Sequence, residues 1–405
     1  MNLITRHLVI FLVGVLLALA LPVVSADAAP SGPPIRIGGS LALTGPLASQ
    51  GIVHKLVGEI YVEQVNRKNG LLGRPVEWVL LDDQSKPEVT RTHYERLITA
   101  DKVDLVIGAF ATGSNLAAMA VAQRYGKILI SNSMGVPKLG TYEMHFPVQG
   151  LPYDPERTFM TTVLDGLASS GKPPKTMAMV ASKFPSVHFI SVGARDVAVK
   201  RGVNVTLYLE YEFGTRDFGP IAARVKEANP DFLWIGGVGL ESKLLLEALK
   251  KLDYMPRGHF SIFPASGPLV VAPEAKFHMS MTTFEEHTPF TNAPAVAEFV
   301  KIFNERAARA GLPYTKVEQQ AGIAYTAWQV LEAAVTGTKS LDDKAMAKWL
   351  KANRVDTIIG KQRFEGPNNF GDDLYRLRQI QGNRWLVVWP KEWAAPGAKL
   401  MYPAP

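Results

Sequence analysis

Short apolar runs alternate with stretches of helical patterning through the first 150 residues of the chain. The apolar runs have the length of buried strands and fall at 35–43, 75–81, 103–107 and 128–131. The stretches between them predict helices at 55–67, 88–100 and 114–125. Because strands and helices alternate, the pattern predicts a parallel sheet with helices on both faces.

The same alternation restarts after about residue 150. Strands are predicted at 176–180, 204–211 and 231–235, and helices at 187–201, 218–229 and 241–251. Three later helices are predicted at 295–310, 319–335 and 342–351, followed by a hairpin over 376–388 that turns at Gln381-Gly382-Asn383 and a loose proline-rich tail. The expected fold class is therefore α/β, with two doubly wound parallel-sheet lobes.

The first 29 residues differ from the rest. Arg6 and His7 precede an apolar run over 8–24 and the small-residue string at 25–29. This order predicts a secretory signal peptide over 1–29, with candidate cleavage sites in Val24-Ser25-Ala26 and Ala26-Asp27-Ala28. An uncleaved anchor helix is the alternative, but Pro22 favours cleavage. No later run is long and apolar enough to cross a bilayer, so a periplasmic protein that is not inserted in the membrane is expected.

The amino-acid composition argues against several classes of function. The 405 residues are 47% hydrophobic and 20% charged, a balance typical of globular proteins. The net charge of +7 is small for this length and forms no long basic run, so nucleic acid is not expected as a partner. Cysteine is absent, which excludes disulfides, cysteine catalysis and zinc–thiolate sites.

Two glycine-rich motifs resemble nucleotide-binding loops without completing them. Residues 166–172 have P-loop spacing, but Pro173 stands where Ser or Thr must hold Mg²⁺. A helix ending at Ser170-Gly171 is the simpler interpretation. Residues 237–242 follow a strand, but Ser242 replaces the third glycine of a dinucleotide fingerprint, so a tight strand–helix turn is expected.

His278, Glu285, Glu286 and His287 do not have the spacing of a zinc site, and we interpret them as solvated loop residues. There is no G-x-S-x-G elbow. The sequence therefore predicts no metal site, no cofactor and no catalytic centre.

Two polar turns carry a more coherent signal. Phe110-Ala111-Thr112-Gly113-Ser114 lies between a predicted strand and a helix, and Asn132-Ser133-Met134-Gly135 follows the next strand. Such turns direct backbone N–H groups and hydroxyls toward one place, where a carboxylate can bind. Ligands collect at these ends of the strands in doubly wound sheets.

Several segments together resemble type I periplasmic binding proteins, in particular the leucine/isoleucine/valine-binding branch that serves ABC importers. The resemblance covers nearly the whole chain after the signal peptide and rests on the order and spacing of its motifs. These motifs are Leu43–Gly51, Asn69–Pro75, Asp82-Asp83, Val106–Gly108, Ala111–Ser114, Gly214–Phe218, Val355–Gly360 and Arg363-Phe364.

The resemblance implies two lobes joined by a three-strand hinge. Lobe one would comprise 35–150 with 288–362, and lobe two 151–287 with 363–400. A small ligand would bind between the lobes, which close over it, and membrane subunits of an ABC permease would recognise the closed form. A monomer is expected.

The resemblance also implies site residues. Thr112, Gly113, Ser133 and Gly135 would hold a ligand carboxylate, and Phe110 and Ala111 would pack its side chain. At three positions the chain departs from the amino-acid binders: Gln50 and Val238 replace tyrosines, and Ser266 replaces the glutamate that holds the ligand ammonium. A further aromatic position falls near Phe184 to Ser186.

These departures leave the ligand open, because an ammonium buried without a counter-charge is costly. Either Asp154, Glu241 or Glu285 supplies the charge, or the ligand is an acid, amide or urea without an ammonium. Tyr153, Phe184 and Phe263 would line such a pocket. The rival function is a ligand sensor of the same fold that signals to a receptor or regulator, for example for amides or urea.

Overall fold

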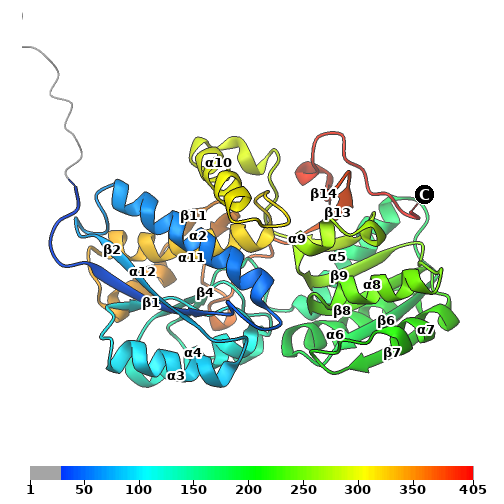
Figure 1. Cartoon of the computed structure of the whole chain (residues 1–405), viewed down its shortest axis with the longest axis horizontal. Helices are drawn as coiled ribbons and strands as arrows, with labels where there is room; N and C mark the ends of the chain where they lie inside the picture. Colours follow the sequence, from blue (N-terminus) through cyan, green and yellow to red (C-terminus); the bar gives the residue numbers. More distant parts are fainter. Residues whose placement is uncertain (1–28, 405) are drawn as a thin grey trace, which may run out of the picture.

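The computed structural model describes residues 29–404, which form two α/β lobes side by side (Figure 1). The predicted signal peptide falls on residues 1–29 and lies outside the described residues except for Ala29. In residues 29–404 no helix has the length and apolarity that a membrane span requires.

The first lobe is built on parallel strands. Its sheet has the order β2-β1-β3, and a bridge between Ile107 and Ile130 connects it to the parallel pair β4-β5. The strands are β1 (Ile35–Leu41), β2 (Val76–Asp82), β3 (Leu105–Val106), β4 (Leu129–Ser131) and β5 (His145–Pro147), with the hairpin β11 (Val355–Thr357) and β12 (Gly360–Gln362) beside them. The helices are α2 (Ala48–Arg67), α3 (Pro87–Thr99), α4 (Thr112–Tyr125), α10 (Pro294–Arg309), α11 (Gln319–Thr338) and α12 (Asp343–Ala352).

The second lobe holds a seven-stranded sheet of order β14-β13-β10-β9-β8-β6-β7. Its strands are β6 (Thr176–Ser182), β7 (Asn204–Tyr211), β8 (Phe232–Gly239), β9 (His259–Pro264), β10 (Met279–Thr282), β13 (Arg376–Gln381) and β14 (Arg384–Trp389). The helices are α5 (Pro155–Ser169), α6 (Pro185–Lys200), α7 (Gly219–Ala228), α8 (Glu241–Lys251) and the short α9 (Ser266–Val270).

Strand β6 shows how the second lobe buries both faces of its sheet. Met177 and Met179 belong to the core that includes residues of α5 and α6, while Ala178 and Val180 belong to the core that includes residues of α7 and α8. Successive side chains of a strand point to opposite faces, so an unbroken apolar run fits a strand covered on both sides. The α/β architecture with two doubly wound parallel-sheet lobes is as predicted.

The chain passes between the two lobes three times, after β5, after β10 and between β12 and β13. We propose the lobe boundaries that the sequence predicts, 35–150 with 288–362 and 151–287 with 363–400, because each passage falls close to one of these limits.

The predicted elements differ from the structure at particular points. Helix α2 begins at Ala48 rather than at 55. Its early turns pack so closely on Ala42 that any side chain at Gly51 would overlap the Ala42 carbonyl oxygen. Strand β8 continues to Gly239 through the predicted tight turn. Pattern reasoning also missed strands β5, β9 and β10.

The prediction of a loose tail is wrong. The Tyr402 ring lies 5.9 Å from that of Phe232 and is 7% exposed, and the Met401 amide donates to Gln379 Oε1 over 2.9 Å. The C-terminus therefore lies against the second lobe (Figure 1). Isolated apolar residues among prolines have no periodicity, so the sequence pattern did not reveal this packing.

Candidate functional site

A cavity of about 390 Å³ lies between the lobes, lined by residues of both. The first lobe contributes the start of α4, the turn after β4 and the start of α11, and the second contributes the start of α6 and residues of β8 and β9. The lining residues are Phe110, Ala111, Thr112, Ser133, Gly135, Gln149, Phe184, Ser186, Val238, Phe263, Gln319, Gln320, Ile323 and Tyr375.

Hydrogen bonds tie the two polar turns of the first lobe together. The Ala111 amide donates to Ser133 Oγ over 2.8 Å, and the Gly135 amide donates to Thr112 Oγ1 over 2.9 Å. Asn115 Nδ2 donates to the carbonyl oxygen of Ala109 over 2.8 Å and to Ser133 Oγ over 3.0 Å. Ala111 has φ 77° and ψ 151°, a conformation that L-residues rarely adopt, so these bonds hold a strained turn in place.

The cavity combines this turn with an uncharged lining. Helix α4 begins at Thr112, and the first amides of a helix have no partner within it and carry partial positive charge. Hydroxyls of Thr112, Ser133, Ser186 and Tyr375 and three glutamine amides supply the other polar groups. Gln319 Nε2 donates to the Tyr375 hydroxyl over 2.9 Å. This arrangement can bind an anion through dipoles, without a lysine or arginine.

Seven of the twelve site residues predicted from the sequence line this cavity. They are Phe110, Ala111, Thr112, Ser133, Gly135, Ser186 and Val238. Phe184 and Phe263, expected as apolar walls, line it as well.

The other five lie elsewhere. A side chain at Gly113 would meet Pro87 of α3 at 3.1 Å, and Tyr153 packs against Phe370, with 6.2 Å between ring centroids. Asp154 is exposed just before α5. Gln50 and Ser266 line a second cavity between the lobes.

Five lining residues escaped sequence reasoning: Gln149, Gln319, Gln320, Ile323 and Tyr375. The first and last lie on passages between the lobes, where no local motif marks them. For Gln319 and Gln320 the sequence did contain a signal, namely the predicted start of a helix at Gln319. The first residues of a helix carry backbone groups without partners in the helix, and such groups can bind a ligand.

The acidic residues considered as partners of a ligand ammonium do not line the cavity. Glu241 lies behind Val238, where its carboxylate accepts from the Val238 amide over 3.0 Å and from Ser182 Oγ over 3.1 Å. Burial raises the pKa of Glu241 to about 7. Burial also raises the pKa of Glu285 to about 7, and its carboxylate pairs with Arg378 over 2.6 Å.

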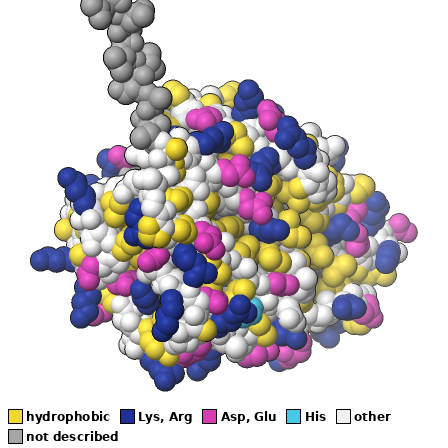
Figure 2. Space-filling model, turned by 60° about the vertical axis from the view of Figure 1, so that its left-hand side comes forward, with side chains coloured by type: hydrophobic (Ala, Val, Ile, Leu, Met, Phe, Trp, Pro, Cys, Tyr) yellow, Lys and Arg dark blue, Asp and Glu magenta, His cyan; other side chains and the backbone are white. Residues whose placement is uncertain are grey.

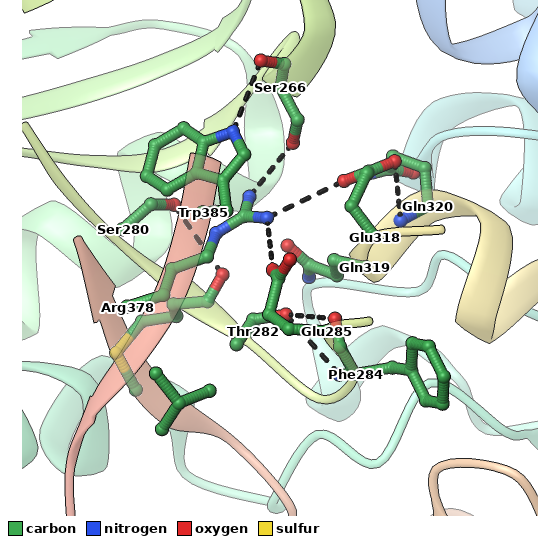
Figure 3. Close-up of polar contacts among 12 residues, drawn as sticks. Ser266, Ser280, Thr282, Phe284, Glu285, Glu318, Gln319, Gln320, Arg378 and Trp385 are labelled. Atoms are coloured by element: carbon green, nitrogen blue, oxygen red, sulfur yellow. Dashed lines mark hydrogen bonds and ion pairs between the residues drawn. The ribbon is translucent and has the colours of Figure 1, made fainter. Parts of the chain in front are cut away.

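Arg378 of β13 is the centre of a buried polar network that joins the lobes (Figure 3). Its guanidinium donates to Ser266 Oγ over 2.8 Å and lies 3.5 Å from Glu318 Oε2 at the start of α11. It also stacks over the Trp385 ring at 4.1 Å. The Ser266 hydroxyl therefore serves as a hydrogen-bond acceptor for this arginine.

The interpretation of His278, Glu285, Glu286 and His287 as solvated is wrong for the first two. His278 and Glu285 are at most 1% exposed, and His278 shares a hydrogen bond of 2.8 Å with Ser261 Oγ. No cluster of potential metal ligands occurs within residues 29–404.

Comparison with known proteins decides the family. The family model described as periplasmic binding protein matches residues 34–384, most of the chain. The chain belongs to this family.

Relatives and solved structures agree with this assignment. The Leu/Ile/Val-binding protein of Escherichia coli is 24% identical over 79% of this chain and 83% of its own. The leucine-binding protein LivK of Thermotoga maritima has a TM-score of 0.74 at 19% identity, over 87% of this chain and 97% of that one. A solute-binding protein of an ABC transporter from R. palustris, solved with benzoate, has a TM-score of 0.75 at 17% identity, over 91% and 99%.

The two lobes of this periplasmic binding protein approach each other closely at Gly135. An alanine there would place its Cβ 2.5 Å from Cβ of Ser186, across the lobe interface. We expect Gly135→Ala to weaken ligand binding about 10- to 100-fold, because the lobes must separate at this point. Isothermal titration calorimetry measures the loss. Gly219→Ala, at the start of α7 and outside the cleft, is the matched control, and equal effects of the two changes would contradict the prediction.

Glu241 gives this binding protein a defined pH dependence. Its folded pKa of about 7 lies above its ordinary value of 4.5, so the folded state binds more protons between these limits and the free energy of unfolding falls as pH rises through them. Glu241→Gln lacks this titration, so its free energy of unfolding does not fall for this reason. The free energy of unfolding of the variant minus that of wild type should therefore rise by up to about 3 kcal/mol between pH 4.5 and 7. Urea unfolding at pH 5 and pH 8 tests this, with exposed Glu227→Gln as control; a constant difference would refute it.

Proposed function

We propose that the protein captures a small carboxylate that carries no ammonium, such as an aromatic or aliphatic acid, and delivers it to an ABC permease. The observation that carries the proposal is the lining of the cleft cavity, which offers a helix N-terminus and clustered hydroxyls but no charged side chain. Its role is capture rather than catalysis.

The start of α4 supports carboxylate binding. Amides at a helix N-terminus and the hydroxyls of Thr112 and Ser133 stabilise negative charge. Ser186 adds a hydroxyl from the second lobe, so a ligand that contacts both lobes favours the closed form.

The apolar walls support an aromatic or aliphatic body. Phe110, Phe184 and Phe263 line the cavity, and Val238 adds a further apolar side chain to its wall. An ammonium here would find no carboxylate, because Asp154, Glu241 and Glu285 lie elsewhere. The benzoate bound by the R. palustris protein is a ligand of the proposed kind.

We further propose that residues 1–29 direct export to the periplasm, where the monomeric protein meets its permease. The basic start, apolar run and small-residue exit of this segment support export. Membership in a family of periplasmic binding proteins supports the location.

A thermal-shift screen of the protein from Ala28 onward tests the ligand class. The panel contains leucine, isoleucine and valine, benzoate-type and hydroxycinnamate-type acids, short fatty acids, urea and amides. A ligand that binds the native state raises the melting temperature. We expect shifts with acids that lack the amine. A shift with the branched-chain amino acids alone would overturn the proposal.

A further inference from the structure

A buried histidine lies directly behind the wall of the cleft cavity. His54, on α2, is 2% exposed and is not among the residues that line the cavity. Its ring packs edge-on against Phe110, with 4.8 Å between the ring centroids and an angle of 63° between the planes. It is also hydrogen-bonded to Gln320. Because Phe110 and Gln320 both line the cavity, His54 supports two parts of its wall from behind.

Two hydrogen bonds assign the hydrogen of the neutral His54 ring to one nitrogen. Asn132 Nδ2, which is a donor, lies 3.1 Å from His54 Nδ1, so Nδ1 accepts. The ring hydrogen is then on Nε2, which lies 3.0 Å from the acceptor Gln320 Oε1. Burial lowers the pKa of His54 to about 4, so the ring is neutral at pH 7. Asn132 therefore donates to His54, and His54 donates to Gln320.

This chain of hydrogen bonds determines which end of the Gln320 amide is available to a ligand. Since Oε1 accepts from His54, the group that Gln320 presents to the cavity is Nε2, a donor with two hydrogens. The backbone of Gln320 is fixed as well, because its N–H donates to Glu318 Oε1 over 3.0 Å (Figure 3). Without His54, the side chain could present either its oxygen or its nitrogen.

A fixed neutral donor suits this cavity. Charged side chains are spread over the face of the molecule seen in Figure 2, whereas every residue that lines the cavity is uncharged. An acceptor atom of a ligand must therefore be met by neutral donors, and a donor that is already oriented loses less entropy on binding. We propose that His54 is a positioning residue, which turns the Gln320 amide so that Nε2 donates to an acceptor atom of the ligand. This inference rests on the proposed function, which places an acid in the cavity.

A double-mutant cycle tests this role by isothermal titration calorimetry. The probe is benzoate, or the acid of the panel with the largest thermal shift if benzoate does not bind. His54→Phe keeps an aromatic ring against Phe110 but removes both nitrogens, and Gln320→Met removes the amide at similar length. We expect each single change to weaken binding about 3- to 10-fold, as for the loss of a neutral hydrogen bond. In the Gln320→Met background, His54→Phe should weaken binding no more than about twofold, because His54 acts through that amide.

Two further variants separate positioning from folding. His54→Gln places a donor near the position of Nε2 and should recover most of the affinity that His54→Phe loses. His145→Phe is the matched control, because His145 is a histidine of the same lobe that is 1% exposed and bonds Ser131 Oγ over 2.7 Å. We expect this control to lower the free energy of unfolding and to leave the affinity for the acid within about twofold of wild type.

Nitrogen NMR spectroscopy of the ligand-free protein tests the chain of hydrogen bonds without relying on a variant that folds. The chemical shifts of the two ring nitrogens report which of them carries the hydrogen, and the spectrum of His54→Gln identifies the signals of His54 by their loss. We expect the neutral ring at pH 7 to carry its hydrogen on Nε2. A hydrogen on Nδ1 would reverse the chain, present Gln320 Oε1 to the cavity and overturn the inference.

The outcomes distinguish this inference from the proposed function. Additive losses in the cycle, or no recovery in His54→Gln, would overturn the role of His54 and leave the proposed function intact. So would unchanged affinity in Gln320→Met, which would mean that the amide faces the second cavity that Gln320 also lines. If no acid of the panel binds wild type, the proposed function fails, and donation to the ligand fails with it.

Discussion

Arg378→Met is expected to lower the free energy of unfolding by about 3–5 kcal/mol, the largest effect on stability that we anticipate from one substitution. The guanidinium is fully buried, pairs with Glu285 and lies beside Glu318. Its removal leaves two buried carboxylates without their cation and ends the stacking on Trp385. Equilibrium urea unfolding measures the loss.

A second substitution distinguishes lost pairing from lost packing. In Arg378→Met combined with Glu285→Gln, one orphaned carboxylate is gone, so part of the lost stability should return. Exposed Arg384→Met, on the neighbouring strand β14, controls for removal of an arginine. If the double variant is no more stable than Arg378→Met, charge pairing is not the reason for the effect.

Thr112→Ala combined with Ser133→Ala is expected to weaken ligand binding at least about hundredfold. The change removes two hydroxyls that line the cavity and the acceptors that tie the two turns together. Without these bonds the strained turn at Ala111 is free to relax, and the start of α4 no longer faces the ligand in a fixed position.

Calorimetric titration with the acid that gives the largest thermal shift measures the effect of this double change. Thr92→Ala is a suitable control, because that hydroxyl donates to a backbone carbonyl on the exposed face of α3, far from any cavity lining. Unchanged affinity in the double variant would show that the ligand does not bind at these turns.

Local pattern was sufficient for the elements whose boundaries depend on their own residues. Strand β7 and helix α8 have the predicted limits, because apolar spacing and flanking turns specify them. The hairpin turn was also readable: Gly382 and Asn383 both have positive φ, as a tight two-residue turn requires.

Contacts between distant residues could not be predicted in this way. Arg378 contacts Glu285 and Ser266, which are 93 and 112 residues away in the sequence. The spacing of apolar and polar residues along the chain does not reveal such pairs. The two polar turns were predictable because each lies where a strand passes into the next segment. The second cavity was not, since it exists only where α2 and α9 face each other across the lobes.

The three passages of the chain between the lobes constrain the order in which the protein can fold as it is synthesised. Strands β6 to β10 of the second lobe emerge before α10, α11 and α12, which complete the first. Until then Tyr61 of α2 lacks Tyr325 and Trp328 of α11, against which its ring packs. The first lobe is therefore completed only after most of the second lobe has been synthesised. A chain that stops before α10 leaves the apolar face of α2 uncovered.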